Sequence, residues 1–128
     1  MATVALAGGF HRACFYITAM SDLYGSDAGR VDGWPSRASR WPYKQPEDGK
    51  KVARRVAPYY DACSFAPRIT CPVRVSLGLE DATCNPPNVQ ASYNRLGSAE
   101  KRMTFDPDTA HGIRGETLTA VYEWLKGK

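Results

Sequence analysis

The chain has 128 residues, of which 43% are hydrophobic and 23% charged, a composition typical of one ordinary globular domain spanning residues 1–128. The net charge of +4 is mildly basic, but the densest basic groups, Lys50-Lys51 and Arg54-Arg55, favour a solvated helix face over a nucleic-acid site. No apolar run approaches the roughly 20 residues of a membrane span. The apolar N-terminus also lacks the preceding basic segment of a signal peptide. We therefore expect neither a nucleic-acid nor a membrane partner, and the cellular compartment stays open.

The cysteines form no C-x-x-C pair, and the chain has only two histidines, so we expect no metal site and no cofactor. Cys63 and Cys71 are close enough in sequence for a disulfide, but separate buried thiols are the favoured interpretation. The four cysteines are Cys14, Cys63, Cys71 and Cys84.

The first elements are apolar. Residues 2–7 end at Gly8-Gly9 and have the pattern of the last turns of a helix closed by glycine. Because a helix at the first residue leaves no room for an N-cap, we expect the chain to begin within an element. The β-prone run from Cys14 to Met20 lacks polar alternation, which predicts a central strand covered on both faces.

Residues 22–48 are dominated by Gly, Pro, Ser and charged side chains, and they predict a long surface excursion. Trp34, Trp41 and Tyr43 are interleaved in it. These aromatic side chains could form a wall on which a sugar ring stacks, or they could pin the loop to the body of the domain. The sequence does not separate the two, so Trp34 and Trp41 are candidate substrate-binding residues.

The rest of the chain alternates between helical and extended patterns. Strands are predicted over residues 73–79 and 101–106. Helices are predicted over residues 49–57, 59–65, 88–96 and 115–126. Asn85 or Asn88 can cap the third of these helices. The alternation predicts an α/β fold, with a three-stranded parallel sheet flanked by helices through right-handed crossovers.

Polar candidates follow each predicted strand, where functional groups gather in open α/β sheets: Asp22, Asp81 and His111. Asp81 and His111 are separated by one helix and one strand, which places them at neighbouring strand ends. Singly, each is better explained as a capping acid or a loop histidine. As an ordered pair they favour two members of a Ser-His-Asp triad, in which the carboxylate orients the imidazole. We prefer Asp81 to the adjacent Glu80 because it lies one step further out of the strand.

The third member, a serine on a G-x-S-x-G elbow, is absent from these 128 residues. Ser21 lacks the flanking glycines of a tight elbow, Ser76 lies inside a predicted strand, and Cys84 has no second base beside it. We therefore expect none of them to be the nucleophile.

Several short motifs accompany the pair: Tyr59-Tyr60-Asp61, Cys71-Pro72-Val73, Gly78-Leu79-Glu80-Asp81, Cys84-Asn85-Pro86-Pro87, Tyr93-Asn94 and His111-Gly112. Together they resemble the C-terminal half of the acetyl xylan esterase / cephalosporin-C deacetylase family of α/β-hydrolases. The run Ala5-Leu6-Ala7 with Arg12 resembles the end of the helix after the nucleophile elbow. The run from Gly29-Arg30 to Gly33-Trp34-Pro35 resembles a loop of a xylan-esterase-like branch.

The resemblance implies a partial α/β-hydrolase fold, with Asp81 as triad acid and His111 as triad base. It also implies deacetylation of acetylated saccharides through an acyl-serine. The chain departs from the family pattern in lacking the elbow serine and the upstream loop of the oxyanion hole. Asn85 also replaces a residue that is often small or cyclic in the family.

We interpret the chain as the C-terminal portion of a serine carboxylic-ester hydrolase and expect it to be inactive alone. One alternative is a non-catalytic α/β domain that binds a partner or a saccharide through its Trp-rich loop. Another is a fragment of a different α/β-hydrolase, dienelactone-hydrolase-like or peptidase-like. In either hydrolase case the strand leading into the elbow is missing, so we expect self-association through the free edge of Cys14 to Met20.

Overall fold

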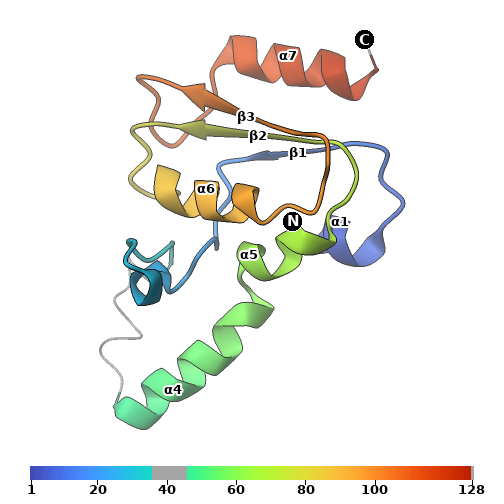
Figure 1. The fold of residues 1–128 in the computed structure, drawn as a ribbon. Coiled ribbons are helices and arrows are strands. Elements are labelled where there is room, and N and C mark those ends of the chain that lie inside the picture. Colours follow the sequence, from blue (N-terminus) through green and yellow to red (C-terminus); the bar gives the residue numbers. More distant parts are fainter. Residues whose placement is uncertain (36–45, 128) are drawn as a thin grey trace.

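The computed structural model describes residues 1–35 and 46–127, and its centre is a three-stranded parallel sheet in the order β1-β2-β3 (Figure 1). The strands are β1 (Ala13–Tyr16), β2 (Val73–Gly78) and β3 (Lys101–Asp106). Val73 lies opposite both Ala13 and Lys101, so the three strands start at one level. Their carboxyl ends therefore lie along one edge of the sheet, and the predicted parallel α/β architecture is confirmed.

Helices cover both faces of the sheet (Figure 1). One face carries α7 (Gly115–Leu125), and the other carries α1 (Ala2–Ala7), α5 (Ala62–Phe65) and α6 (Pro86–Asn94). Three short 3₁₀ turns complete the described fold: η1 (Gly25–Ala28), η2 (Ala57–Tyr59) and η3 (Ala66–Arg68).

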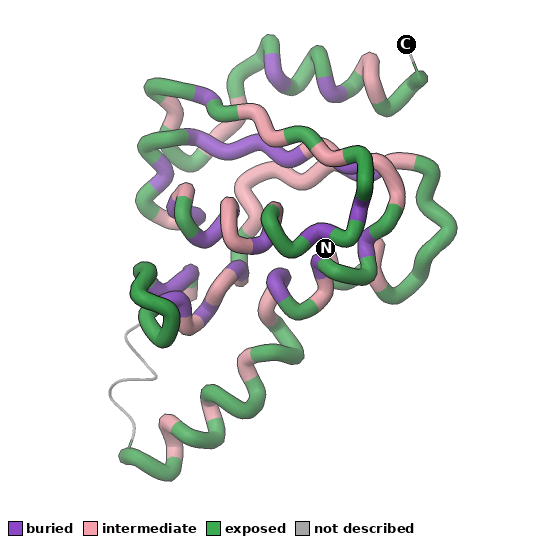
Figure 2. Tube along the Cα trace, viewed as in Figure 1, coloured by how far each residue is buried: buried purple, intermediate pink, exposed green. Residues whose placement is uncertain are grey.

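The core lies between β2 and the helices on the α6 face. Val73, Val75 and Leu77 alternate along β2 and point to this face, each 1% exposed. These three side chains pack with Ala13, Ala66, Ile69, Cys84, Val89 and Leu96. Figure 2 shows β2 as the longest buried stretch of the sheet. Burial of one such side chain contributes about 1.5–3 kcal/mol relative to its exposure.

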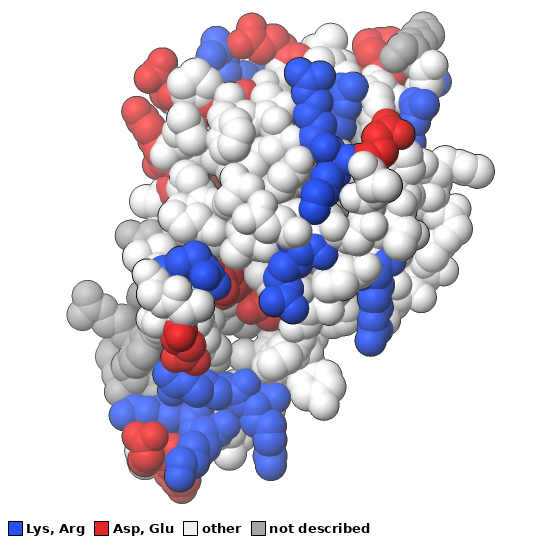
Figure 3. All heavy atoms as spheres, in the orientation of Figure 1, with Lys and Arg blue, Asp and Glu red and all other residues white. Residues whose placement is uncertain are grey.

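Helix α4 (Glu47–Val56) projects from the body and has no buried residue (Figures 1 and 2). Its first turn is acidic and its last turn basic, which suits the helix dipole. Figure 3 shows the resulting mixture of acidic and basic side chains at this end of the molecule. This exposure agrees with the interpretation of its basic residues as a solvated face.

Helix α6 begins two residues before the predicted start. Pro86 and Pro87 occupy its first turn, where a missing N–H costs nothing, and Asn85 caps it by accepting a hydrogen bond from the backbone of Asn88 at 3.4 Å. Asn85 is therefore the cap, one of the two residues predicted for that role.

Two predicted elements were wrong in extent. The strand predicted from Cys14 to Met20 ends at Tyr16, because Ile17 and Met20 have φ values of 47° and 53°, outside the extended region. β1 is also an edge strand of the described sheet, and three of its four residues are only half-buried. The helix predicted over residues 59–65 is instead η2 and α5, separated by Tyr60 and Asp61.

The predicted excursion over residues 22–48 contains η1 and ends where α4 begins at Glu47. Trp41 and Tyr43 lie outside the described residues. The four cysteines are free thiols in the structure; Cys63 and Cys84 are buried, and Cys14 and Cys71 are half-buried. Within the described ranges, no helix has the length and apolar character needed to cross a membrane.

Candidate active site

Asp81 and His111 meet at the carboxyl edge of the sheet. Asp81 lies in the turn after β2, and His111 in the loop after β3. Nδ1 of His111 is 3.0 Å from Oδ2 and 3.2 Å from Oδ1 of Asp81. The predicted geometry is therefore present, with a carboxylate oxygen within hydrogen-bond distance of the imidazole.

The local turn fixes the Asp81 carboxylate. Its Oδ1 accepts hydrogen bonds from the backbone N–H groups of Thr83 and Cys84 at 2.8 and 2.9 Å. The Asp81 side chain is 1% exposed, whereas that of His111 is 54% exposed. A buried acid thus faces one side of an imidazole whose other side is open to solvent.

The histidine loop approaches the end of β2 closely because residue 78 is glycine. A Cβ on Gly78 would lie 2.2 Å from the carbonyl oxygen of Thr109 and 2.4 Å from that of Ala110. The backbone N–H of Glu80 donates to the Thr109 carbonyl at 3.0 Å. The loop that carries His111 is therefore hydrogen-bonded to the turn that carries Asp81.

A buried carboxylate, Asp106, joins the two ends of the histidine loop. Its Oδ1 accepts from the Thr117 hydroxyl at 2.6 Å, and its Oδ2 accepts from the Ser76 hydroxyl at 3.2 Å and the Arg114 N–H at 3.4 Å. Asp106 ends β3, and Arg114 precedes α7. The Asp106 side chain therefore links the beginning of the histidine loop, at the end of β3, to its end at the start of α7.

The pair can carry out acid–base chemistry. With Nδ1 donating to Asp81, the lone pair of Nε2 is free to accept a proton, and the carboxylate stabilises the imidazolium that forms. Beside the pair, burial and, to a smaller extent, the negative charge of Asp81 raise the pKa of the Cys84 thiol to about 11. That thiol is protonated at neutral pH and does not compete as a nucleophile.

Other residues weighed from the sequence lie elsewhere. Glu80 is exposed, and it is Asp81 that contacts the imidazole. Asp22 forms a two-bond ion pair with Arg30 at 2.7 and 3.0 Å. The buried Ser21 hydroxyl donates to the carbonyl of Thr18 at 3.1 Å.

The two remaining candidates in the described residues are Ser76 and Trp34, and neither is hydrogen-bonded to the Asp81–His111 pair. Ser76 donates to Asp106, as above, and is buried within β2. Trp34 is 40% exposed and does not line the pocket described next. Its role in saccharide binding stays a prediction, as does that of Trp41.

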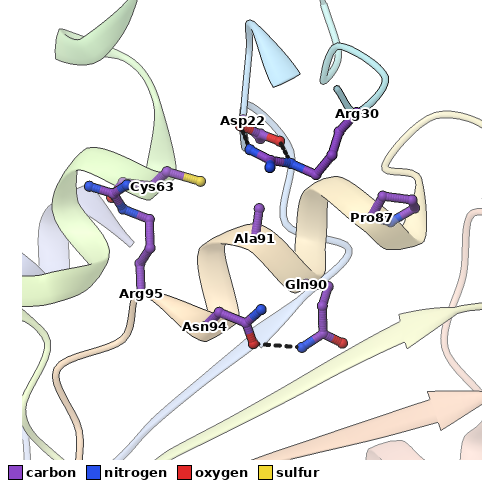
Figure 4. A pocket seen from close by; sticks show the side chains of 8 residues that line it. All are labelled: Asp22, Arg30, Cys63, Pro87, Gln90, Ala91, Asn94 and Arg95. Atoms are coloured by element: carbon purple, nitrogen blue, oxygen red, sulfur yellow. Dashed lines mark hydrogen bonds and ion pairs between the residues drawn. The ribbon is translucent and has the colours of Figure 1, made fainter. Parts of the chain in front are cut away.

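A separate open pocket of about 470 Å³ lies between α6 and the loop that follows β1. Figure 4 shows the Asp22–Arg30 pair on one wall and Ala91 of α6 pointing toward it. Neither Asp81 nor His111 lines this pocket. The other lining residues are Cys63, Pro87, Gln90, Asn94 and Arg95.

Gly78 and Asp106 help to position the histidine loop, and neither was predicted from the sequence. The signal for Gly78 was a glycine inside a predicted strand, which indicates a close backbone approach. The signal for Asp106 was an acid ending a strand just before a polar turn. In both cases the partner group comes from a distant part of the chain.

The parallel sheet with helices on both faces has the α/β-hydrolase fold, as its similarity to two solved structures shows. The solved acetyl xylan esterase from Paenibacillus sp. R4 superposes with a TM-score of 0.75 at 21% identity, over 91% of this chain and 37% of that one. Acetyl xylan esterase 1 from Thermoanaerobacterium sp. JW/SL YS485 superposes with a TM-score of 0.71 at 23% identity, over 96% of this chain and 40% of that one. At these levels of identity, both comparisons establish a shared fold only.

Sequence comparison gives the family. Residues 41–128 match the family described as acetyl xylan esterase (AXE1). Acetyl esterase Axe7A of Xylanibacter ruminicola is 32% identical over 108 residues, which cover 84% of this chain but 23% of that protein. The chain belongs to the acetyl xylan esterase family, and it spans about a quarter of the length of this curated relative.

Proposed function

We propose that Asp81 and His111 are the acid and the base of a serine carboxylic-ester hydrolase that removes acetyl groups from xylan or related sugars. The observation that carries the proposal is the 3.0 Å contact between His111 Nδ1 and a buried Asp81, with the rest of the imidazole exposed. Family membership supports the acetylated saccharide as substrate. The serine would come from a polypeptide segment outside these 128 residues.

In this mechanism Nε2 of His111 takes the serine proton as the serine oxygen attacks the acetyl carbonyl. The imidazolium, stabilised by Asp81, then returns the proton to the leaving sugar oxygen. Water repeats the sequence on the acyl-serine and releases acetate. Trp34, with its exposed ring, is proposed to stack on the saccharide, and Trp41 is proposed to assist it.

The test joins residues 1–128 to the upstream part of the Thermoanaerobacterium esterase and measures hydrolysis of p-nitrophenyl acetate and release of acetate from acetylated xylan. We expect the chimera to be active and His111→Ala to lower kcat at least about 10²-fold, because general acid–base catalysis supplies about 10²–10⁴. The matched control is His11→Ala, an exposed histidine distant in sequence. A His111→Ala chimera with the parental kcat would overturn the proposal.

The chain alone should hydrolyse p-nitrophenyl acetate no faster than its own His111→Ala variant, because a triad without its nucleophile retains only weak binding-type catalysis. A burst of product from the purified chain would instead show a local nucleophile, with Ser21 and Cys84 the first to examine. Inactive chimeras that still bind xylan through Trp34 would favour a non-catalytic saccharide-binding role.

A further part of the proposal is that the free edge of β1 pairs with a second copy of the chain. No described strand occupies that edge, and residues 13–16 carry no charge and no proline. Size-exclusion chromatography over a concentration series should show association that Cys14→Lys reduces and the exposed control Ala99→Lys does not. A wild-type chain that stays monomeric at high concentration would contradict this part.

A further inference from the structure

Three potential metal ligands converge beside the acid–histidine contact. One ligand atom each from Asp81, Cys84 and His111 lies within 4.8 Å of the other two. Asp81 and Cys84 share one turn, and His111 comes from the next loop along the sheet edge. The sequence predicted that Asp81 and His111 lie close together, but it did not predict a set of metal ligands that includes Cys84.

We infer that Asp81, Cys84 and His111 form a binding site for one soft divalent cation, Cd²⁺ or more weakly Zn²⁺, which removes His111 from acid–base chemistry when bound. A thiolate, an imidazole nitrogen and a carboxylate oxygen are the donors of zinc-type sites. Three protein ligands leave a fourth position for water. Mg²⁺ and Ca²⁺ prefer all-oxygen sites, so the sulfur donor disfavours them.

The site is largely formed before a cation arrives. Both backbone hydrogen bonds to Asp81 Oδ1 hold the carboxylate and leave Oδ2 to face the imidazole. Bond lengths of about 2.0–2.3 Å place tetrahedral ligand atoms about 3.3–3.8 Å apart. The 3.0 Å separation of His111 Nδ1 and Asp81 Oδ2 must therefore open slightly, and any separation near the 4.8 Å limit must close by about 1 Å. The half-exposed His111 ring gives the entry path.

Binding exchanges protons as follows. The S–H bond of Cys84 breaks, a sulfur–metal bond forms, and the thiol proton passes to solvent. His111 loses its Nδ1 proton to make the nitrogen–metal bond and gains one on Nε2, so the imidazole stays neutral. Cations with a high affinity for thiolate displace this proton most readily.

The tautomer change explains the effect on catalysis. A metal on Nδ1 leaves a proton on Nε2, and that nitrogen can no longer accept the proton of a nucleophile. Metal binding and general-base function therefore exclude each other at His111. This consequence rests on the proposed function, whereas the binding itself does not.

The test titrates the full chain with CdCl₂ and follows two signals. The first is the sulfur-to-cadmium charge-transfer absorption, and the second is the ¹⁵N–¹H spectrum of the imidazoles, simple because the chain has two histidines. We expect one equivalent of Cd²⁺ to produce the absorption and to move the His111 proton from Nδ1 to Nε2. The signals of His11 should not change.

Variants assign the ligands. Cys84→Ser should abolish the absorption, and His111→Ala should weaken binding by more than the roughly tenfold cost of losing an outer-shell partner. Cys71→Ser and His11→Ala are the matched controls and should bind as the wild type does. If Cys84→Ser fails to fold by circular dichroism, the wild-type imidazole spectrum decides the question.

An undiminished absorption in folded Cys84→Ser, or an unchanged His111 spectrum at saturating Cd²⁺, would overturn the inference. The proposed function is tested separately by the chimera in metal-free buffer. If Cd²⁺ binds at these ligands but His111→Ala does not change kcat of the chimera, the metal site is supported and the proposed esterase role is contradicted.

Discussion

The two faces of the sheet differ in how completely helices cover them. On the α6 face, the alternating side chains of β2 are 1% exposed and belong to one continuous core. On the α7 face, Thr117 and Val121 are the buried residues of the helix, while Leu118, Tyr122 and Leu125 remain 42%, 59% and 39% exposed. Of the four side chains Leu118, Val121, Tyr122 and Leu125, only that of Val121 is therefore buried.

The site is divided between these two regions. Asp81 follows the fully packed strand and is buried, whereas His111 lies on the loop that leads to the sparsely packed α7 and is half-exposed. The acid is therefore positioned by the core, whereas the histidine is positioned by a few hydrogen bonds and one glycine. Substitutions in the two regions should therefore have unequal effects.

The largest expected effect is on the α6 face. Leu77→Ala should lower the free energy of unfolding by about 2–5 kcal/mol, because it leaves a cavity in a packed core. Leu118→Ala on the α7 face is the matched control and should cost less than about 1 kcal/mol, because this residue is already 42% exposed. Urea unfolding of both variants checks the prediction, and equal losses would erase the distinction between the faces.

Gly78→Ala tests the contact between the end of β2 and the loop that carries His111. Its new methyl group meets two backbone carbonyls, so we expect a loss of about 1–3 kcal/mol and displacement of the His111 loop. Gly115→Ala, at the open start of α7, should be neutral or stabilising by up to about 1 kcal/mol. Loss of the low-field Nδ1 proton signal of His111 in Gly78→Ala, but not in Gly115→Ala, is the expected readout. An unchanged signal in Gly78→Ala would show that the loop is held by other contacts.

The smallest effect concerns α4, which packs on neither face. Its Arg54 donates hydrogen bonds to Asp27 at 3.0 and 3.2 Å, and this contact lowers the pKa of the Asp27 carboxyl. The stability it contributes is present above the unfolded pKa of Asp27 and is lost as pH falls through the lower folded value. Because both side chains are exposed, Arg54→Ala should cost less than about 1 kcal/mol at neutral pH.

The acid dependence provides the check on that ion pair. The difference in unfolding free energy between wild type and Arg54→Ala should shrink as pH falls through the acidic range in which Asp27 takes up a proton. Lys51→Ala, on the same helix, is the control and should show no such convergence. If the difference in unfolding free energy stays constant down to acidic pH, the Arg54–Asp27 ion pair does not contribute to stability.

The sequence was informative where local pattern and tertiary environment agree. β3 was predicted with the bounds it has, and β2 to within one residue, because turn-forming residues delimit both short runs, with Pro72 before β2 and Pro107 after β3. Asp81 and His111 could be paired because parallel strands bring their carboxyl ends to one edge. The pairing of Asp22 with Arg30 was not visible, because both lie in an irregular loop.

Other features needed the folded chain. β1 ends early because Ile17 enters the left-handed region, which a β-branched residue rarely adopts and no propensity predicts. Gly78 is required by a backbone that arrives from the next strand, and Cys84 joins the acid–histidine pair only through the turn it shares with Asp81. These contacts join segments that are separate in the sequence, so local periodicity does not predict them.

The central claim is that Asp81 and His111 act as one catalytic unit. The most direct measurement is a double-mutant cycle in the active chimera, with kcat determined for Asp81→Asn, His111→Ala and the combination. Asp108→Asn makes the same chemical change at an exposed acid of the histidine loop and serves as control. The account predicts that the double variant is no slower than His111→Ala alone, because members of a triad are strongly non-additive. Multiplicative losses, or an Asp81→Asn chimera as active as Asp108→Asn, would contradict it.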